Sequence, residues 1–85
     1  MDNIRELKVS KNTEPKKLAG TIKYYIQKGD SCKLLALGQQ PICISVKSIA
    51  LLSSMFNIDY SCHISYFHQN LSDSTITGIQ FLLNI

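Results

Sequence analysis

The stretch between Lys33 and Asp59 constrains the fold most strongly, because Lys47 is its single charged residue. A short apolar run over 32–37 ends at Gly38, and a polar turn precedes it. A run of this length and composition is typical of a buried central strand. A second, longer apolar run follows and carries Lys47 in its middle. The chain must therefore bury two consecutive apolar elements in a small fold.

The second apolar run predicts a helix over 41–56 that follows a loop at 38–41, since proline suits a first helical turn. On a wheel of 3.6 residues per turn, one face holds Ile42, Val46, Ile49, Ser53 and Phe56. The nearly opposite face holds Ile44, Leu51 and Met55. A helix that is apolar on two sides is usually buried on two sides. We therefore expect a homodimer with Ile44, Leu51 and Met55 at its interface. The alternative is that another helix of the same chain covers that side alone.

The remaining periodicities complete an order of β-α-β-α-β-β. In chain order, the further elements are a strand over 6–9, a helix from an N-cap at Thr13 to a stop at Gly29, a strand over 60–67, a polar loop over 68–74 and a strand over 75–83. This order predicts an α/β fold, an α+β two-layer sandwich, as one domain over residues 1–85.

The basic residues are concentrated at one end of the chain. Eight of the nine lysines and arginines fall within the first 33 residues, and the formal net charge is +3. This asymmetry hints at a basic face for an anionic partner, although a solvated helix surface would give the same pattern. The candidates are Lys8, Lys11, Lys16 and Lys17, which flank the end of the first strand and the start of the first helix. Lysines there can neutralise phosphates without reading base sequence.

Signatures of catalysis or of a bound cofactor are missing from the sequence. The chain contains no nucleotide-binding glycine loop. Cys62 and His63 are adjacent, so a strand would place them on opposite faces and not in one metal site. We expect no enzyme, metal, cofactor or small-molecule substrate; an enzyme using Cys62 or His63 is the remote alternative.

The cysteine count and the hydropathy predict a cytoplasmic protein. Three cysteines without a C-x-x-C pair favour reduced thiols over a disulfide framework. The first residues lack the apolar core of a secretory signal, and no run approaches the length of a transmembrane helix. No membrane partner is expected.

Several short motifs together resemble the stage V sporulation protein S (SpoVS) family. The resemblance covers nearly the whole chain and rests mainly on joint spacing, including the interval from Gly38 to Lys47. The matching segments are Leu7-Lys8-Val9-Ser10, Leu18-Ala19-Gly20-Thr21-Ile22, Ala36-Leu37-Gly38, Val46-Lys47-Ser48-Ile49-Ala50 and Thr77-Gly78-Ile79-Gln80-Phe81.

The resemblance implies an Alba-like fold, with a four-stranded mixed sheet and two helices on one face. Alba-type proteins are dimers that bind DNA or RNA, and the family acts in late sporulation, in coat assembly and core dehydration, by a regulatory route. Position by position, the residues implied to face nucleic acid are Lys11, Lys16, Lys17, Gly38, Gln39 and Gln40. Lys47 matches the lysine of the family's Val-Lys pair, and its charge would reach the basic surface or an acidic group of the partner subunit.

The chain departs from the family pattern at Cys43-Ile44, where the family has Asn-Gln, and at Pro41, where it has small residues. These changes make the second helix more apolar. We expect a dimeric nucleic-acid-binding regulator with weak sequence specificity, because lysines contact phosphates and few arginines are present to read guanine. The alternative is a protein-interaction module with the same fold and dimer that binds no nucleic acid.

Overall fold

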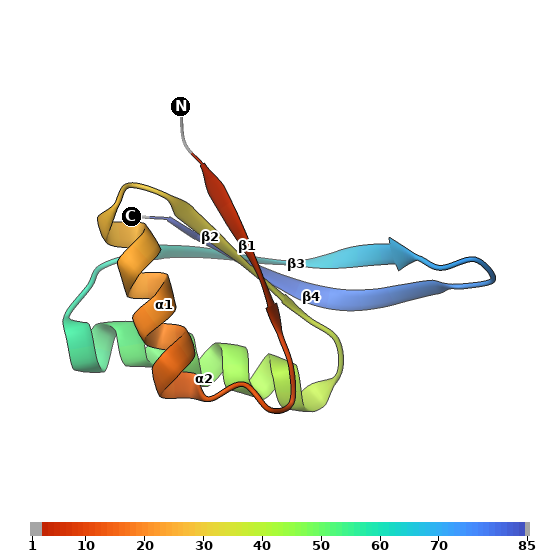
Figure 1. The fold of residues 1–85 in the computed structure, drawn as a ribbon, viewed down its shortest axis with the longest axis horizontal. Helices are drawn as coiled ribbons and strands as arrows, with labels where there is room; N and C mark the ends of the chain where they lie inside the picture. Colours follow the sequence, from red (N-terminus) through yellow and green to blue (C-terminus); the bar gives the residue numbers. More distant parts are fainter. Residues whose placement is uncertain (1–2, 85) are drawn as a thin grey trace.

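The secondary-structure elements follow the predicted order, β-α-β-α-β-β. The computed structural model describes residues 3–84. Its elements are β1 (Ile4–Val9), α1 (Pro15–Gln27), β2 (Ser31–Ala36), α2 (Gln39–Phe56), β3 (Ser61–Asn70) and β4 (Thr75–Asn84). Both helices lie on the same side of the sheet, so the protein is an α+β two-layer sandwich, as expected (Figure 1).

The sheet is mixed, and its strand order is β1-β2-β4-β3. β1 and β2 are parallel, and β4 is antiparallel to both of its neighbours. Helix α1 makes the crossover between the parallel strands. Helix α2 connects β2 to β3. These two strands are not neighbours in the sheet, because β4 lies between them. The β3–β4 hairpin runs past the helices and accounts for the long dimension of the molecule, 43 Å (Figure 1).

The core lies between the helices and one face of the sheet. Side chains alternate along β2, so that every second residue is completely buried. The largest fully buried apolar residues are Ile22 and Ile26 of α1, Cys32 and Leu34 of β2, Leu52 of α2, and Phe81 and Leu83 of β4. Each buried aliphatic or aromatic side chain of this size contributes about 1.5–3 kcal/mol relative to an exposed one.

Helix α1 begins one residue later than predicted, because Thr13 is not its N-cap. The N-cap is Glu14, whose side chain makes no capping hydrogen bond, and Pro15 occupies the first helical position. The Thr13 hydroxyl instead accepts a hydrogen bond from the Ser10 N–H at 3.0 Å and closes the preceding turn. The predicted end of the helix at Gly29 is confirmed. Gly29 follows the C-cap residue and has φ +92°, a conformation that favours glycine.

Helix α2 begins earlier than predicted. Gln39 and Gln40 form its first turn, where the sequence predicted a loop, and Gly38 with φ +96° is the N-cap. Pro41 lies in the first turn, as expected. The helix ends at Asn57, whose left-handed conformation is a common C-cap.

The buried face of α2 lies between the two faces predicted from the wheel. The buried residues are Pro41, Ser45, Ser48, Ile49 and Leu52, whereas Val46 is 52% exposed. The two serines can be buried because their hydroxyls donate to carbonyls one turn back. Ser45 Oγ lies 2.8 Å from the Pro41 carbonyl oxygen, and Ser48 Oγ lies 2.7 Å from that of Ile44. The prediction of two separate apolar faces was therefore wrong.

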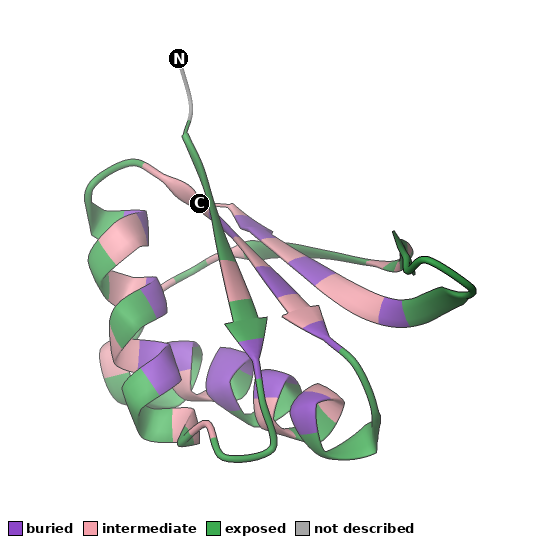
Figure 2. Ribbon diagram, turned by 45° about the vertical axis from the view of Figure 1, so that its right-hand side comes forward, coloured by how far each residue is buried: buried purple, intermediate pink, exposed green. Residues whose placement is uncertain are grey.

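Strand β3 continues through residues that the sequence analysis predicted as loop. His68 pairs with Thr77 and Asn70 pairs with Thr75, so the connecting loop is only 71–74. His68 Nδ1 lies 3.0 Å from Thr77 Oγ1. Pairing with β4 satisfies the backbone of these polar residues, and the far end of the hairpin is exposed (Figure 2).

Candidate nucleic-acid interface

The carboxyl ends of β1 and β2 bring two predicted segments together. Because these strands are parallel and Val9 pairs with Ala36, the loops that follow them leave the sheet at one edge. A depression of about 490 Å³ lies there, and both loops contribute to its lining. Four predicted residues line this depression: Lys11, Gly38, Gln39 and Gln40.

The start of α2 contributes backbone donors to this depression. Gly38 has no side chain with which to cap the helix, and the first intrahelical bond of this turn runs from the Ile42 N–H to the Gly38 carbonyl. The N–H groups of Gln39 and Gln40 therefore remain free of intrahelical partners. With the positive end of the helix dipole, they favour an anion beside Lys11.

Lys16 and Lys17 lie in the first turn of α1, close after the turn that carries Lys11. Both are exposed. Lys17 Nζ lies 3.2 Å from Glu14 Oε2, but both side chains are largely in solvent, where such a pair contributes little. A phosphate could therefore displace Glu14 from Lys17 at low cost.

Lys47 lies apart from the depression at the strand ends. It lines a mainly apolar groove of about 480 Å³ between the start of α1 and the middle of α2. Glu14, Pro15 and Lys16 form one wall of this groove, and Leu51 belongs to the other. Lys16 thus links the two regions, since it lines this groove and starts the helix that follows Lys11.

Lys8 lies on a third surface, the face of the sheet without helices. Val9 and Leu7 pack toward the helices, so the alternation of the strand directs Lys8 to the other side. There it lines a depression with Lys33 of β2. The structure therefore does not group Lys8 with the other predicted lysines.

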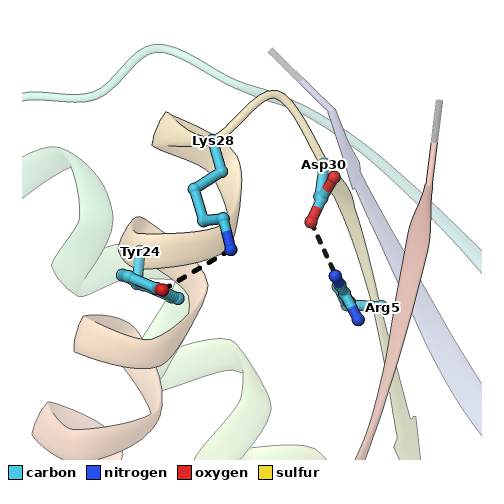
Figure 3. Close-up of polar contacts among 4 residues, drawn as sticks. All are labelled: Arg5, Tyr24, Lys28 and Asp30. Carbon is cyan, nitrogen blue, oxygen red and sulfur yellow. Dashed lines mark hydrogen bonds and ion pairs between the residues drawn. The ribbon is translucent and has the colours of Figure 1, made fainter. Parts of the chain in front are cut away.

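Other basic residues are engaged within the chain. Arg5 Nε lies 3.0 Å from Asp30 Oδ2 (Figure 3), and this hydrogen bond and ion pair raise the pKa of Arg5 above its ordinary value. Lys28 Nζ lies 3.5 Å from the Tyr24 hydroxyl (Figure 3) and 4.9 Å from the centre of that ring. Lys23 Nζ lies 4.4 Å above the Phe56 ring. Within residues 3–84, Lys11 and Lys16 make no such contact, and Lys17 pairs only with the exposed Glu14.

The residues predicted for a dimer interface differ in exposure. Ile44 and Leu51 are half-buried against the core, and Met55 is 51% exposed. The analysis of the sequence missed a larger exposed apolar set on the helix side of β3, where Ile64 is 59% exposed and Tyr66 is 71% exposed. Neither helix covers this part of β3, so both side chains face solvent.

The cysteines show no sign of activation as nucleophiles. Cys62 and His63 pair with successive residues of β4, so they lie on opposite faces of the sheet, as predicted. Burial raises the pKa of the Cys62 thiol, and burial together with the charge of Asp30 raises that of Cys32 to about 11. Both thiols therefore hold their protons at neutral pH.

Residues 3–84 contain neither a cluster of metal ligands nor a helix that could span a membrane. Within that range, no three or more histidine, cysteine, aspartate or glutamate side chains are grouped so that they could hold a metal ion. None of the helices there has the length and apolar character needed to cross a membrane.

Comparison with known protein families gives a match over nearly the whole chain. The family described as Stage V sporulation protein S (SpoVS) matches residues 5–85, nearly the whole chain. No curated protein matches the sequence. The family match agrees with the resemblance in the motifs and identifies a small sporulation-related protein.

Proposed function

We propose, from the premise that the chain belongs to the stage V sporulation protein S family, that this protein is a dimeric nucleic-acid-binding regulator of Alba-like type. It would act by binding and not by catalysis. The observation that supports this most directly is the shared depression at the ends of β1 and β2. It combines a lysine, a glycine-capped helix start and free backbone donors.

The depression and the start of α1 form the proposed phosphate-binding surface, defined by Lys11, Lys16, Lys17 and residues 38–40. Its cations lie in the turn after β1 and in the first turn of α1, so they can contact successive phosphates of one backbone. Three lysines per protomer would neutralise about six phosphates in a dimer. For duplex DNA this corresponds to a slope of log affinity against log salt of about −5.

The dimer is proposed to form through exposed apolar residues of α2 and β3. Val46 of α2 is 52% exposed, and Ile64 and Tyr66 of β3 lie on the same side of the sheet as the helices. β3 is an edge strand, and the Tyr60 hydroxyl donates to the Ile49 carbonyl at 3.1 Å, which holds the start of β3 against α2. A second copy would cover this apolar surface. The interface predicted from the sequence used the opposite flank, at Ile44, Leu51 and Met55.

The same apolar surface favours a second candidate function. A protein-interaction module of this fold would use Val46, Ile64 and Tyr66 to bind another protein and would bind no nucleic acid. The experiment below separates the two, since binding through apolar residues is insensitive to salt whereas phosphate binding is not.

The test is a titration of labelled duplex DNA and single-stranded RNA at 50 and 200 mM salt. We expect wild-type affinity for the duplex to fall ~10³-fold across this range. The variant Lys16→Glu/Lys17→Glu should bind at least ~10-fold more weakly at low salt and show a shallower salt slope.

The matched control is Lys23→Glu/Lys28→Glu, which makes the same change in net charge on the same helix. Its lysines rest on aromatic rings of the chain, away from the proposed surface. Equal losses in the two variants would mean that net charge alone drives binding. Absence of binding by the wild-type protein at low salt would refute the proposed function.

A further inference from the structure

The helix-free face of the sheet carries a groove that the phosphate-binding surface does not include. Two adjoining depressions, of about 320 and 210 Å³, lie on this face. Both are lined by residues from β1, β2 and β3. The residues shared by the two are Lys8, Leu35, Phe67 and Gln69. We call these two depressions the sheet groove.

Phe67 is held firmly in the sheet groove by its cross-strand partner, Gly78 of β4. A Cβ atom at Gly78 would lie 2.5 Å from Phe67 Cε1 and 2.7 Å from Cζ. The ring therefore occupies the space above a residue without a side chain, in direct contact with the backbone of β4. Phe67 nevertheless remains half-exposed. An immobilised aromatic ring that is open to solvent on a sheet is a platform on which a nucleobase can stack.

The charges around the ring suit a single-stranded polyanion. Lys8 lines both depressions with Phe67, and Lys33 lines the larger one. Glu6 is the one acid among the lining residues, so two lysines outnumber one carboxylate in the larger depression. Gln69 also lines both depressions and offers an amide for a base edge.

The sheet groove is continuous with the phosphate-binding surface. Val9 and Leu37 line both the smaller depression of the sheet groove and the depression that contains Lys11 and residues 38–40. A strand with a base on Phe67 and a phosphate on Lys8 can therefore continue over the ends of β1 and β2. A duplex lacks unstacked bases and could use only the second part of this path.

We infer that the sheet groove binds single-stranded nucleic acid by stacking a base on Phe67 with a phosphate on Lys8. This inference rests on the proposed nucleic-acid function and makes it more specific. It gives the protein two modes: duplex binding through the phosphate-binding surface alone, and single-strand binding through both surfaces.

The test compares Phe67→Leu and Phe67→Tyr with the wild type, using labelled oligouridine, oligothymidine and duplex DNA at 50 mM salt. Leucine keeps an apolar side chain over Gly78 but removes the aromatic ring, whereas tyrosine keeps the ring. We expect Phe67→Leu to weaken single-strand binding ~10-fold, Phe67→Tyr to retain it, and both to bind duplex like the wild type.

A second variant guards against misfolding of Phe67→Leu. Lys8→Gln changes an exposed side chain, and we expect it to reduce single-strand affinity and to lower the salt slope by about 0.7. Unchanged single-strand binding in both Phe67→Leu and Lys8→Gln would overturn the inference and leave the proposed function intact. Wild-type protein that binds duplex only would do the same. Wild-type protein that binds neither would overturn both.

Discussion

Replacing Gly78 with alanine tests how Phe67 packs against β4, and the melting temperature of the protein is the readout. The added Cβ would lie 2.5 Å from Phe67 Cε1 and 2.7 Å from the Ala36 carbonyl oxygen. The ring could shift, but the oxygen belongs to the backbone of β2 and cannot move without disturbing the β2–β4 pairing. Overpacking of this kind costs about 1–3 kcal/mol, and the backbone contact places Gly78→Ala toward the upper end. For a chain of this size, we expect the melting temperature to fall by ~10–15 °C.

Gly20→Ala is the matched control. Gly20 lies in the interior of α1, and a Cβ there would meet nothing within 4 Å. Alanine at such a position stabilises a helix by about 0.5–1 kcal/mol. Thermal unfolding followed by circular dichroism would compare the two variants. A Gly78→Ala melting temperature at or above that of the wild type would refute the packing argument. The double variant Phe67→Leu/Gly78→Ala should recover part of the loss, because the ring contact is removed and the Ala36 contact remains.

Two further predictions concern the buried thiol and the dimer. The free thiol of the unfolded chain ionises near pH 8.5, whereas burial raises the pKa of Cys32 to about 11. Unfolding therefore releases a proton in this window, and the free energy of unfolding should fall as pH rises from about 8.5 to 11, by at most about 1.4 kcal/mol per unit. Urea melts across this pH range should show a smaller loss of unfolding free energy for Cys32→Ala than for the wild type. Equal losses in the two proteins would contradict the raised pKa of Cys32. For the dimer, Ile64→Ser/Tyr66→Ser should weaken self-association at least ~100-fold in sedimentation experiments, and Met55→Ser should not. The opposite ranking would favour the interface predicted from the sequence, and a monomeric wild-type protein would refute the dimer.

The order and type of the elements could be predicted from periodicity alone, but the strand order could not. Each helix and strand carries its own apolar pattern, and glycines mark the end of α1 and the start of α2. The position of β4 between β2 and β3 depends on which edges pair in three dimensions. Similarly, strand β3 extends over polar residues because β4 supplies their backbone partners.

The buried face of α2 was mispredicted for a chemical reason. Ser45 and Ser48 count as polar on a wheel, yet their hydroxyls are satisfied by carbonyls of their own helix. This allows small residues to face the core while larger apolar ones lie at its margins. The interface expected at Ile44, Leu51 and Met55 stays a prediction, and the structure adds Val46 as an exposed apolar residue on the other margin.

The candidate site was predictable in part. The grouping of Lys11 with residues 38–40 follows from two parallel strands whose ends share an edge, which the β-α-β order already implies. The separate location of Lys8 could have been inferred, since alternation with Leu7 and Val9 places it on the other face of the sheet. That of Lys47 depends on how α2 is rotated against the rest of the fold. The contact between Phe67 and Gly78 requires the register of β3 against β4, and two residues eleven positions apart give no local signal of it.

The position of β4 in the sheet also affects how this protein folds during synthesis. β4 is the last strand in chain order, yet it lies between two others and supplies Phe81 and Leu83 to the core. While the ribosome is still adding the residues before Thr75, β2 has an unpaired edge and the core is incomplete. Folding therefore cannot advance element by element along the nascent chain. It must wait for β4, and until then an exposed strand edge is available to chaperones or to aggregation.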